Sequence, residues 1–84
     1  MMDVRLSSAA HDEAMRLTTS ARTRVLVLIE RLAQWPRVSG AKRLTGQWAG
    51  CFRLRTGDYR VIFRLEDGAV RVLKIGHRKD IYED

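Results

Sequence analysis

The chain reads CFRLRTGDYRVIFRL from Cys51 to Leu65, and the fold is predicted chiefly from these residues. Polar and apolar residues alternate on both sides of Gly57-Asp58, which predicts two antiparallel strands joined by a two-residue turn. Glycine in the first turn position favours a type II′ turn. With that turn Leu54 faces Val61, so apolar side chains meet on one face of the hairpin and arginines collect on the other.

A third strand is predicted to complete a meander. Asp67-Gly68 is a favoured type I′ turn, and Val70–Ile75 alternates as the returning strand. The face expected to pack on helices carries Phe52, Leu54, Val61, Phe63, Leu65 and Val72. The opposite face carries Arg53, Arg55, Arg60, Arg64 and Arg71 above an apolar floor of Ile62, Leu73 and Ile75. Guanidinium groups this close repel one another unless an anion lies among them, so this face favours an anionic ligand.

The N-terminal residues predict one short strand and one helix. Asp3–Ser7 alternates between polar and apolar residues, as a first strand does. Ser7 or Ser8 can then cap a helix that runs from about Ala9 to Arg16-Leu17.

A second helix is predicted from Ala21 to about Gln34, capped by Ser20 and ended by Trp35-Pro36, where proline removes a backbone donor. Its apolar residues repeat at helical spacing: Val25, Leu28, Ile29 and Leu32. Residues 37–50 are expected to form a loop. The predicted fold class is therefore α+β: a short N-terminal strand, a helical hairpin, then a three-stranded antiparallel meander whose one face packs on the helices.

Length and composition limit the classes of protein that fit. The chain has 84 residues, 45% hydrophobic and 31% charged, which suits a single folded domain over residues 1–84. No apolar run approaches the roughly 18 residues that cross a bilayer, and no signal-peptide pattern follows Met1, so a cytoplasmic location is expected, without a membrane partner. One cysteine, Cys51, and two separated histidines predict no disulfide and no metal site, and no cofactor is expected.

Positive charge is concentrated in the second half of the chain. Sixteen Lys and Arg residues against ten Asp and Glu residues give a net charge of +6, and thirteen of the cations are arginines. Residues 42–79 contain ten basic and three acidic residues, whereas the remainder sums to −1. The planar arginine fork matches phosphate oxygens, so this distribution indicates a surface for a polyanion such as nucleic acid.

Two stretches, FRLRTGDYRVIF (Phe52–Phe63) and LKIGHRKDIY (Leu73–Tyr82), resemble the RelE branch of the RelE/ParE toxin superfamily. The upstream KRLTG (Lys42–Gly46) is similar to the loop before the second strand in that family, and the order of elements is the same. The resemblance extends over nearly the whole chain and is more specific to the superfamily than to one activity within it. It implies a single RelE-like domain that serves as the toxin of a type II toxin–antitoxin pair.

The resemblance implies two alternative activities. RelE-like members cleave mRNA in the ribosomal A site, whereas ParE-like members poison DNA gyrase. Arg53, Arg60, Arg78 and Tyr82 match the family's catalytic positions. The best-known RelE-like members have lysines where this chain has Cys51 and Arg53, so their lysine acid–base chemistry does not carry over.

RNA cleavage without a metal needs a base near the 2′-OH, donors for the phosphate and an acid for the leaving 5′ oxygen. Arg60 and Arg53 are expected to hold the phosphate, and Arg78 to serve the leaving side. Proton transfer falls to Tyr82 or His77, and that choice stays open, since a phenol has an ordinary pKa of about 10 whereas imidazoles titrate nearer neutrality. Further phosphate contacts are expected from Lys42, Arg43, Arg55, Arg64, Arg71 and Lys79.

The predicted function is that of an mRNA endoribonuclease toxin with mRNA and the 70S ribosome as partners. A gyrase inhibitor and a non-catalytic protein that binds RNA or the ribosome are the alternatives. A cationic face with an apolar floor also suits an acidic amphipathic helix. The resemblance accordingly implies a cognate, acidic, helix-containing antitoxin and a hetero-oligomer with it.

Overall fold

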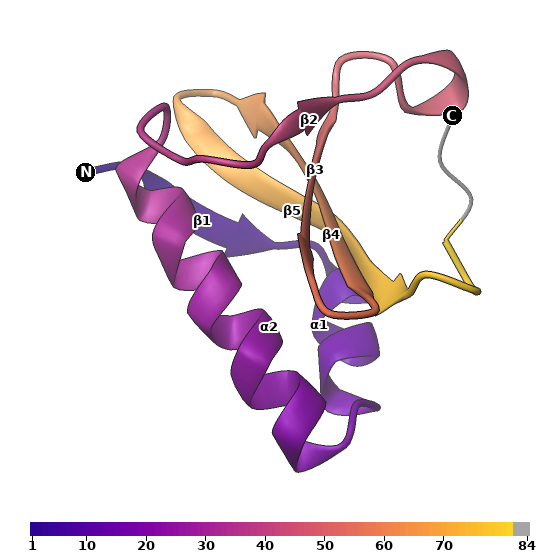
Figure 1. Ribbon diagram of the computed structural model, residues 1–84. Coiled ribbons are helices and arrows are strands. Elements are labelled where there is room, and N and C mark those ends of the chain that lie inside the picture. The colour runs from indigo at the N-terminus through magenta and orange to yellow at the C-terminus, as the bar shows by residue number, and fades with distance from the viewer. Residues whose placement is uncertain (82–84) are drawn as a thin grey trace.

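The computed structural model describes residues 1–81. These form a five-stranded sheet and two α-helices. The strands are β1 (Asp3–Leu6), β2 (Lys42–Arg43), β3 (Phe52–Thr56), β4 (Tyr59–Glu66) and β5 (Ala69–His77), and the helices are α1 (Ser8–Met15) and α2 (Thr19–Arg31). The strand order is β1-β5-β4-β3-β2, with β1 parallel to β5 and the other neighbours antiparallel. Both helices lie on the same side of the sheet (Figure 1), so the predicted α+β class is confirmed.

The hairpin of β3 and β4 has the predicted register. Leu54 pairs with Val61, and Arg55 pairs with Arg60. Gly57 has a φ of 58°, while Asp58 does not have a positive φ, as a type II′ turn requires. The next turn has a positive φ at both Asp67 and Gly68, 52° and 75°, which fits the predicted type I′ turn.

Helix α1 begins close to its predicted start. The Ser7 side chain accepts the backbone N–H of Ala10 at 3.0 Å, so Ser7, rather than Ser8, is the N-cap. The same hydroxyl donates to the carbonyl of Leu73 at 3.2 Å and thereby ties the start of α1 to β5. The helix ends at Met15, one residue before the predicted end.

Helix α2 begins two residues before the predicted start, and the prediction of Ser20 as its cap was wrong. Thr18 is extended and its side chain accepts the N–H of Ala21 at 3.2 Å, so threonine caps the helix first. The helix ends at Arg31, and the last predicted residues, Leu32–Gln34, tighten into a 3₁₀ turn ahead of Pro36. The buried stripe of α2 includes Val25, Leu28 and Ile29, as its spacing predicted.

The meander gains a strand on each side. β1 pairs along Ala69–Val72 of β5, and Lys42–Arg43 pairs with Phe52-Arg53 at the opposite edge. Residues 37–50 were predicted to be a loop, but they contain strand β2 and the 3₁₀ turn Gly46–Trp48. Two-residue pairing at a sheet edge leaves no periodic signal in the sequence, which is why β2 was not predicted.

A register shift in β5 changes which residues face the helices. Phe63 pairs with Val72 but Ile62 pairs with Lys74, so β5 has one extra residue at this point. Ile75 consequently lies in the core beneath the helices, and its predicted place on the opposite face was wrong. Leu65 lies on the predicted face, since it pairs with Val70 of the core, but its expected packing on the helices was wrong, because it lies at the end of β4 and is 47% exposed.

The main core lies between the helices and the sheet. Its fully buried side chains include Val25, Leu32, Val61, Phe63 and Val72. The ring of Trp35 contacts that of Phe63 edge-on, with centroids 5.4 Å apart. Within residues 1–81, no helix is both long enough and apolar enough to cross a bilayer.

Candidate nucleic-acid interface and active site

The sheet face away from the helices is not an open groove. Leu44, Cys51, Ile62 and Ile81 are buried there in a second, smaller core, with Trp48 and Leu73 packed against it. A Cβ atom at Gly76 would lie 3.3 Å from the side chain of Ile81, so the segment after β5 folds back onto the sheet. The predicted apolar floor is therefore covered, and the cations of this face are divided between its two ends.

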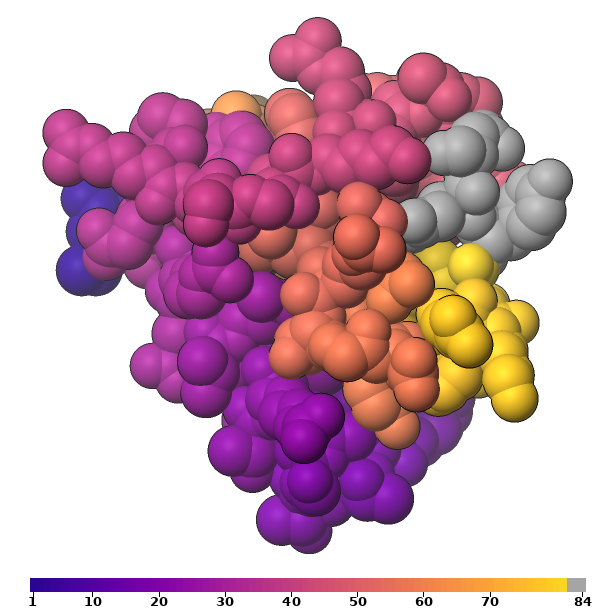
Figure 2. Space-filling view, in the orientation of Figure 1, coloured from indigo at the N-terminus to yellow at the C-terminus, as the bar shows by residue number. Residues whose placement is uncertain are grey.

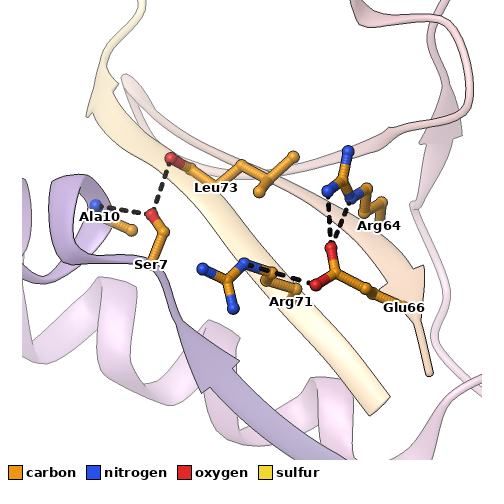
Figure 3. A network of polar contacts seen from close by, with 6 residues as sticks. All are labelled: Ser7, Ala10, Arg64, Glu66, Arg71 and Leu73. Carbon is orange, nitrogen blue, oxygen red and sulfur yellow. Dashed lines mark hydrogen bonds and ion pairs between the residues drawn. The ribbon is translucent and has the colours of Figure 1, made fainter. Parts of the chain in front are cut away.

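At one end, Arg64 and Arg71 share a carboxylate. They are direct neighbours across β4 and β5, and both point at Glu66 (Figure 3). The Arg64 Nη2 and Nε atoms lie 2.6 and 2.9 Å from Glu66 Oε2, and Arg71 Nε lies 4.0 Å from Oε1. The hydrogen bond from Arg64 lowers the pKa of Glu66, and Glu66 in turn raises the pKa of Arg64. An internal carboxylate thus relieves the repulsion between these two arginines.

At the other end, the turn between β3 and β4 gathers residues from two segments. We call Asp58, Tyr59, Arg60, His77 and Arg78 the turn cluster. The Arg78 N–H donates to the Asp58 carbonyl at 2.7 Å, which extends the pairing of Tyr59 with His77 by one residue. Figure 2 shows the orange hairpin lying against the yellow segment that follows β5. Three predicted site residues, Arg60, His77 and Arg78, are thereby brought to one turn.

The Arg60 guanidinium is held by carbonyls. Its Nη1 lies 3.3 Å from the oxygen of Gly57 and 3.4 Å from that of Tyr59. No carboxylate of residues 1–81 lies within ion-pair distance of Arg60, in contrast to Arg64 and Arg71. Its positive charge therefore remains available to an anionic ligand.

The imidazole of His77 is fixed on three sides. The Lys79 N–H donates to Nδ1 at 3.1 Å, and Nε2 lies 3.9 Å from Asp58 Oδ2. The Tyr59 ring meets the imidazole edge-on, with the centroids 5.5 Å apart. Arg78 Nε lies 3.6 Å from the other Asp58 oxygen, so Arg78 and His77 both face the same carboxylate.

The other predicted residues lie in different surroundings. Arg53, paired with Lys42 across β2 and β3, is only 8% exposed, whereas Arg55 is exposed. Arg43 shares a sheet face with Phe52, and its guanidinium lies 5.7 Å from that ring, on the helix side of the sheet rather than with the other cations. Lys79 is exposed beside the turn cluster, and Tyr82 lies outside the described residues.

Sequence reasoning missed the two carboxylates that organise this face. Asp58 lies in one turn and Glu66 directly precedes the other, so each could have been found by asking which acid a hairpin turn brings beside the neighbouring strand. The thiol of Cys51 is buried as predicted, and this burial raises its pKa. Within residues 1–81, no group of three or more His, Cys, Asp or Glu residues could hold a metal ion.

A cavity of about 430 Å³ adjoins the turn cluster. Tyr59, His77 and Gly76 line one side, and α1 contributes Glu13, which pairs with Lys74 at 2.9 Å. Glu13 also accepts the N–H of Ile75 at 2.9 Å and so occupies the edge of β5 beyond the end of β1. The cavity is within the size range of small-ligand sites.

The chain thus has a small α+β fold with a cationic turn at the end of its sheet. A family model described as "ParE toxin of type II toxin-antitoxin system, parDE" matches residues 4–82, so the chain belongs to this toxin family. A stretch of 43 residues is 42% identical to Toxin RelG of Mycobacterium tuberculosis. That match covers 49% of this chain and 49% of Toxin RelG, about half the length of each.

Solved structures agree with this assignment. The structure of the RelBE2 toxin–antitoxin complex from Mycobacterium tuberculosis matches with 28% identity and a TM-score of 0.79, over 94% of this chain and 93% of that one. Isolated Escherichia coli RelE matches with 20% identity and a TM-score of 0.76, over 92% and 84% of the two chains. The ParDE structure from Pseudomonas aeruginosa has 13% identity and a TM-score of 0.75, over 92% and 96%. The last two show the fold alone, and the resemblance to RelE/ParE toxins is confirmed.

Proposed function

We propose that this toxin is an endoribonuclease that cleaves mRNA, in the ribosomal A site, through attack of a ribose 2′-OH on the adjacent phosphodiester. The observation that carries the proposal is the turn cluster. It brings the Arg60 and Arg78 guanidinium groups and the His77 imidazole to one turn, and His77 also lines the cavity beside that turn. Cations fixed by a turn and a strand end are suited to stabilising charge that develops on a phosphate.

Each step of the proposed reaction has a candidate residue. The 2′ oxygen attacks phosphorus and the bond to the 5′ oxygen breaks, which leaves a 2′,3′-cyclic phosphate and a 5′-hydroxyl. Arg60 stabilises the phosphate together with Arg53, which lies two residues along β3 from Arg55, the cross-strand partner of Arg60. Arg78 acts on the leaving side. Tyr82 is the candidate for taking the 2′-OH proton. Lys42, Arg55 and Lys79 extend the phosphate-binding surface outward from the turn.

The proposal is tested by mapping mRNA 5′ ends in a translating extract with the purified toxin. Wild type should produce new ends within codons, and Arg60→Ala should reduce them about 10²- to 10³-fold, the usual effect of removing one transition-state donor. Arg37→Ala is the matched control, because Arg37 is an exposed arginine in the loop after α2. Intact transcripts with folded wild type would refute the nuclease proposal.

Inhibition of DNA gyrase is the second candidate, favoured by the family model that names ParE. A gyrase poison binds a protein and needs no scissile phosphate, so Arg60→Ala should leave its toxicity largely intact. Supercoiling by purified gyrase in the presence of wild type and Arg60→Ala separates the two activities. A non-catalytic RNA binder would differ from both, with affinity that falls steeply with salt and no cleavage.

We also propose that an acidic, helix-containing antitoxin binds this chain. The supporting observations are the net charge of +6 and the toxin–antitoxin complexes among the similar structures. The outer surface of the helices also exposes apolar side chains, with Met15 at 55%, Leu26 at 42% and Val27 at 55%. Native co-purification should yield a small acidic companion, and recovery of the free chain alone would contradict this.

A further inference from the structure

The hydrogen bonds of His77 define which of its nitrogens carries the proton. The Lys79 N–H donates to Nδ1, and a ring nitrogen that accepts a hydrogen bond has no proton of its own. The proton of the ring therefore lies on Nε2. The edge-on contact with Tyr59 holds the ring in this orientation.

This arrangement does not suit proton transfer by His77. A base would have to receive the proton at Nδ1, where the Lys79 N–H already lies, because Nε2 is protonated. An acid would need a second proton at Nδ1, the atom that accepts the Lys79 N–H. What the ring offers is a fixed N–H donor, since neutral imidazoles can polarise a substrate oxygen without exchanging a proton.

The Nε2 donor lies near a carboxylate that a phosphate could replace. Nε2 of His77 and Nε of Arg78 lie 3.9 and 3.6 Å from the two oxygens of Asp58. The Asp58 side chain is 61% exposed, and its ion pair with Arg78 and its contact with His77 are open enough for another anion to displace the carboxylate. A phosphate offers two or more oxygens to the same pair of donors.

Among the carboxylates of residues 1–81, that of Asp58 is the one within ion-pair distance of the His77 ring. Glu13, from α1, is paired with Lys74 and bonded to the N–H of Ile75. Arg16, which directly follows α1, and Asp80, in the segment after β5, line the same cavity as His77. Arg60 adds positive charge at the same turn.

We propose that His77 acts as a neutral Nε2–H donor to the scissile phosphate rather than as an acid or base, at a position that Asp58 occupies in the free protein. The inference rests on the proposed nuclease function. In the cleavage step the proton of the 2′-OH passes to a base and the 5′ oxygen takes a proton from an acid, while His77 exchanges none. Asp58 competes with the phosphate and is released when RNA binds.

Glutamine tests the role of His77, because its amide N–H₂ lies near the position of Nε2 but does not titrate. We expect His77→Gln to keep kcat within about tenfold of wild type, with an unchanged pH profile, and His77→Ala to lose about 10²-fold or more. His11→Gln, on the exposed face of α1, is the matched control. Equal loss in His77→Gln and His77→Ala, or no loss in either, would overturn the inference.

Substitution of Asp58 tests the competition. Asp58→Asn keeps the backbone contact to Arg78 but removes the charge, so KM for RNA should fall about fivefold with kcat unchanged. Asp67→Asn is the matched control, because Asp67 lies in the other hairpin turn and asparagine tolerates its positive φ. A lower kcat or a higher KM in Asp58→Asn would show that the carboxylate assists the reaction and would contradict the competition.

The proton position can be measured without activity. Nitrogen-15 NMR of the full chain should show a protonated Nε2 and an unprotonated Nδ1 at His77 at neutral pH, and the opposite tautomer would refute the inference. Wild type that leaves RNA intact refutes the proposed function instead. In that case Asp58→Asn should still bind an RNA oligonucleotide about fivefold more tightly, and unchanged binding would count against the site itself.

Discussion

At the scale of single residues, the arginines of the sheet differ in what holds them. Arg64 and Arg71 face the Glu66 carboxylate, whereas Arg60 is bonded to carbonyls, which leave its full charge in place. From the sequence alone, all of these arginines have the same charge and the same predicted role. Their partners separate those that stabilise the native sheet from those that remain available to a ligand.

Glu66 should make the stability of the protein depend on acid pH. Its pKa in the folded chain is below the ordinary 4.5, chiefly because Arg64 donates to it, so the ionised form stabilises the native state. That contribution is present above about pH 4.5 and is lost as the pH falls through the lowered value. Glu66→Gln should therefore lower the thermal midpoint at pH 7, and the difference from wild type should shrink in acid.

Glu30→Gln on the exposed side of α2 is the control and should show no such trend. Thermal unfolding followed by circular dichroism between pH 3 and 7 measures both variants. A midpoint difference for Glu66→Gln that stays constant over this range would contradict the ion-pair assignment.

At the scale of elements, the caps and turns determine where each helix and strand begins. Ser7 caps α1 and also bonds the Leu73 carbonyl, next to the register shift in β5 (Figure 3). The Thr18 side chain caps α2, and within residues 1–81 the capping bond is its only hydrogen bond. The two caps thus differ by one tertiary hydrogen bond.

We therefore expect substitution of the two caps to lower the free energy of unfolding by different amounts. Thr18→Ala should destabilise the protein by about 1 kcal/mol, the usual value for a lost cap. Ser7→Ala should cost about 2 kcal/mol, because it also leaves the Leu73 carbonyl without its hydroxyl donor. Urea unfolding measures the free energy of unfolding of both variants. Equal losses would mean that the hydrogen bond from Ser7 to β5 contributes nothing to stability.

The elements also show what the sequence can and cannot predict. The Leu54–Val61 register followed from a two-residue turn and from alternation, both of which are local properties. The extra residue in β5 was not predictable in this way, because Val70–Ile75 alternates well on its own and the shift arises from pairing with both neighbouring strands. For the same reason Ile75 was assigned to the wrong face.

At the scale of the whole molecule, the second core divides the cationic face and concentrates available charge at the β3–β4 turn. The residue types of the site were predictable, since Arg60, His77 and Arg78 all carry suitable chemistry. Their meeting at Asp58 was not, because it depends on how the segment after β5 returns to the hairpin. Ile81, buried against Gly76, determines that return.

Because the second core separates the cations at the β3–β4 turn from Arg64 and Arg71, we expect these two ends of the sheet to bind RNA with unequal affinity. Arg55→Ala, at the turn end, should weaken RNA binding and lower the slope of log affinity against log salt by about one unit. Arg64→Ala should change both less, because Arg64 is already paired with Glu66. Fluorescence anisotropy with a labelled oligonucleotide at several salt concentrations measures both, and a larger effect of Arg64→Ala would contradict the division.

The turn cluster is proposed to cleave RNA by attack of the RNA's own 2′-OH on the adjacent phosphodiester, and the chemistry of the product ends is the sharpest test of this claim. In a translating extract with wild-type toxin, the new fragments should carry 5′-hydroxyl and 2′,3′-cyclic phosphate ends, and Arg60→Ala should scarcely produce them. New ends that carry a 5′-phosphate, or arrested growth with intact mRNA, would contradict the claim.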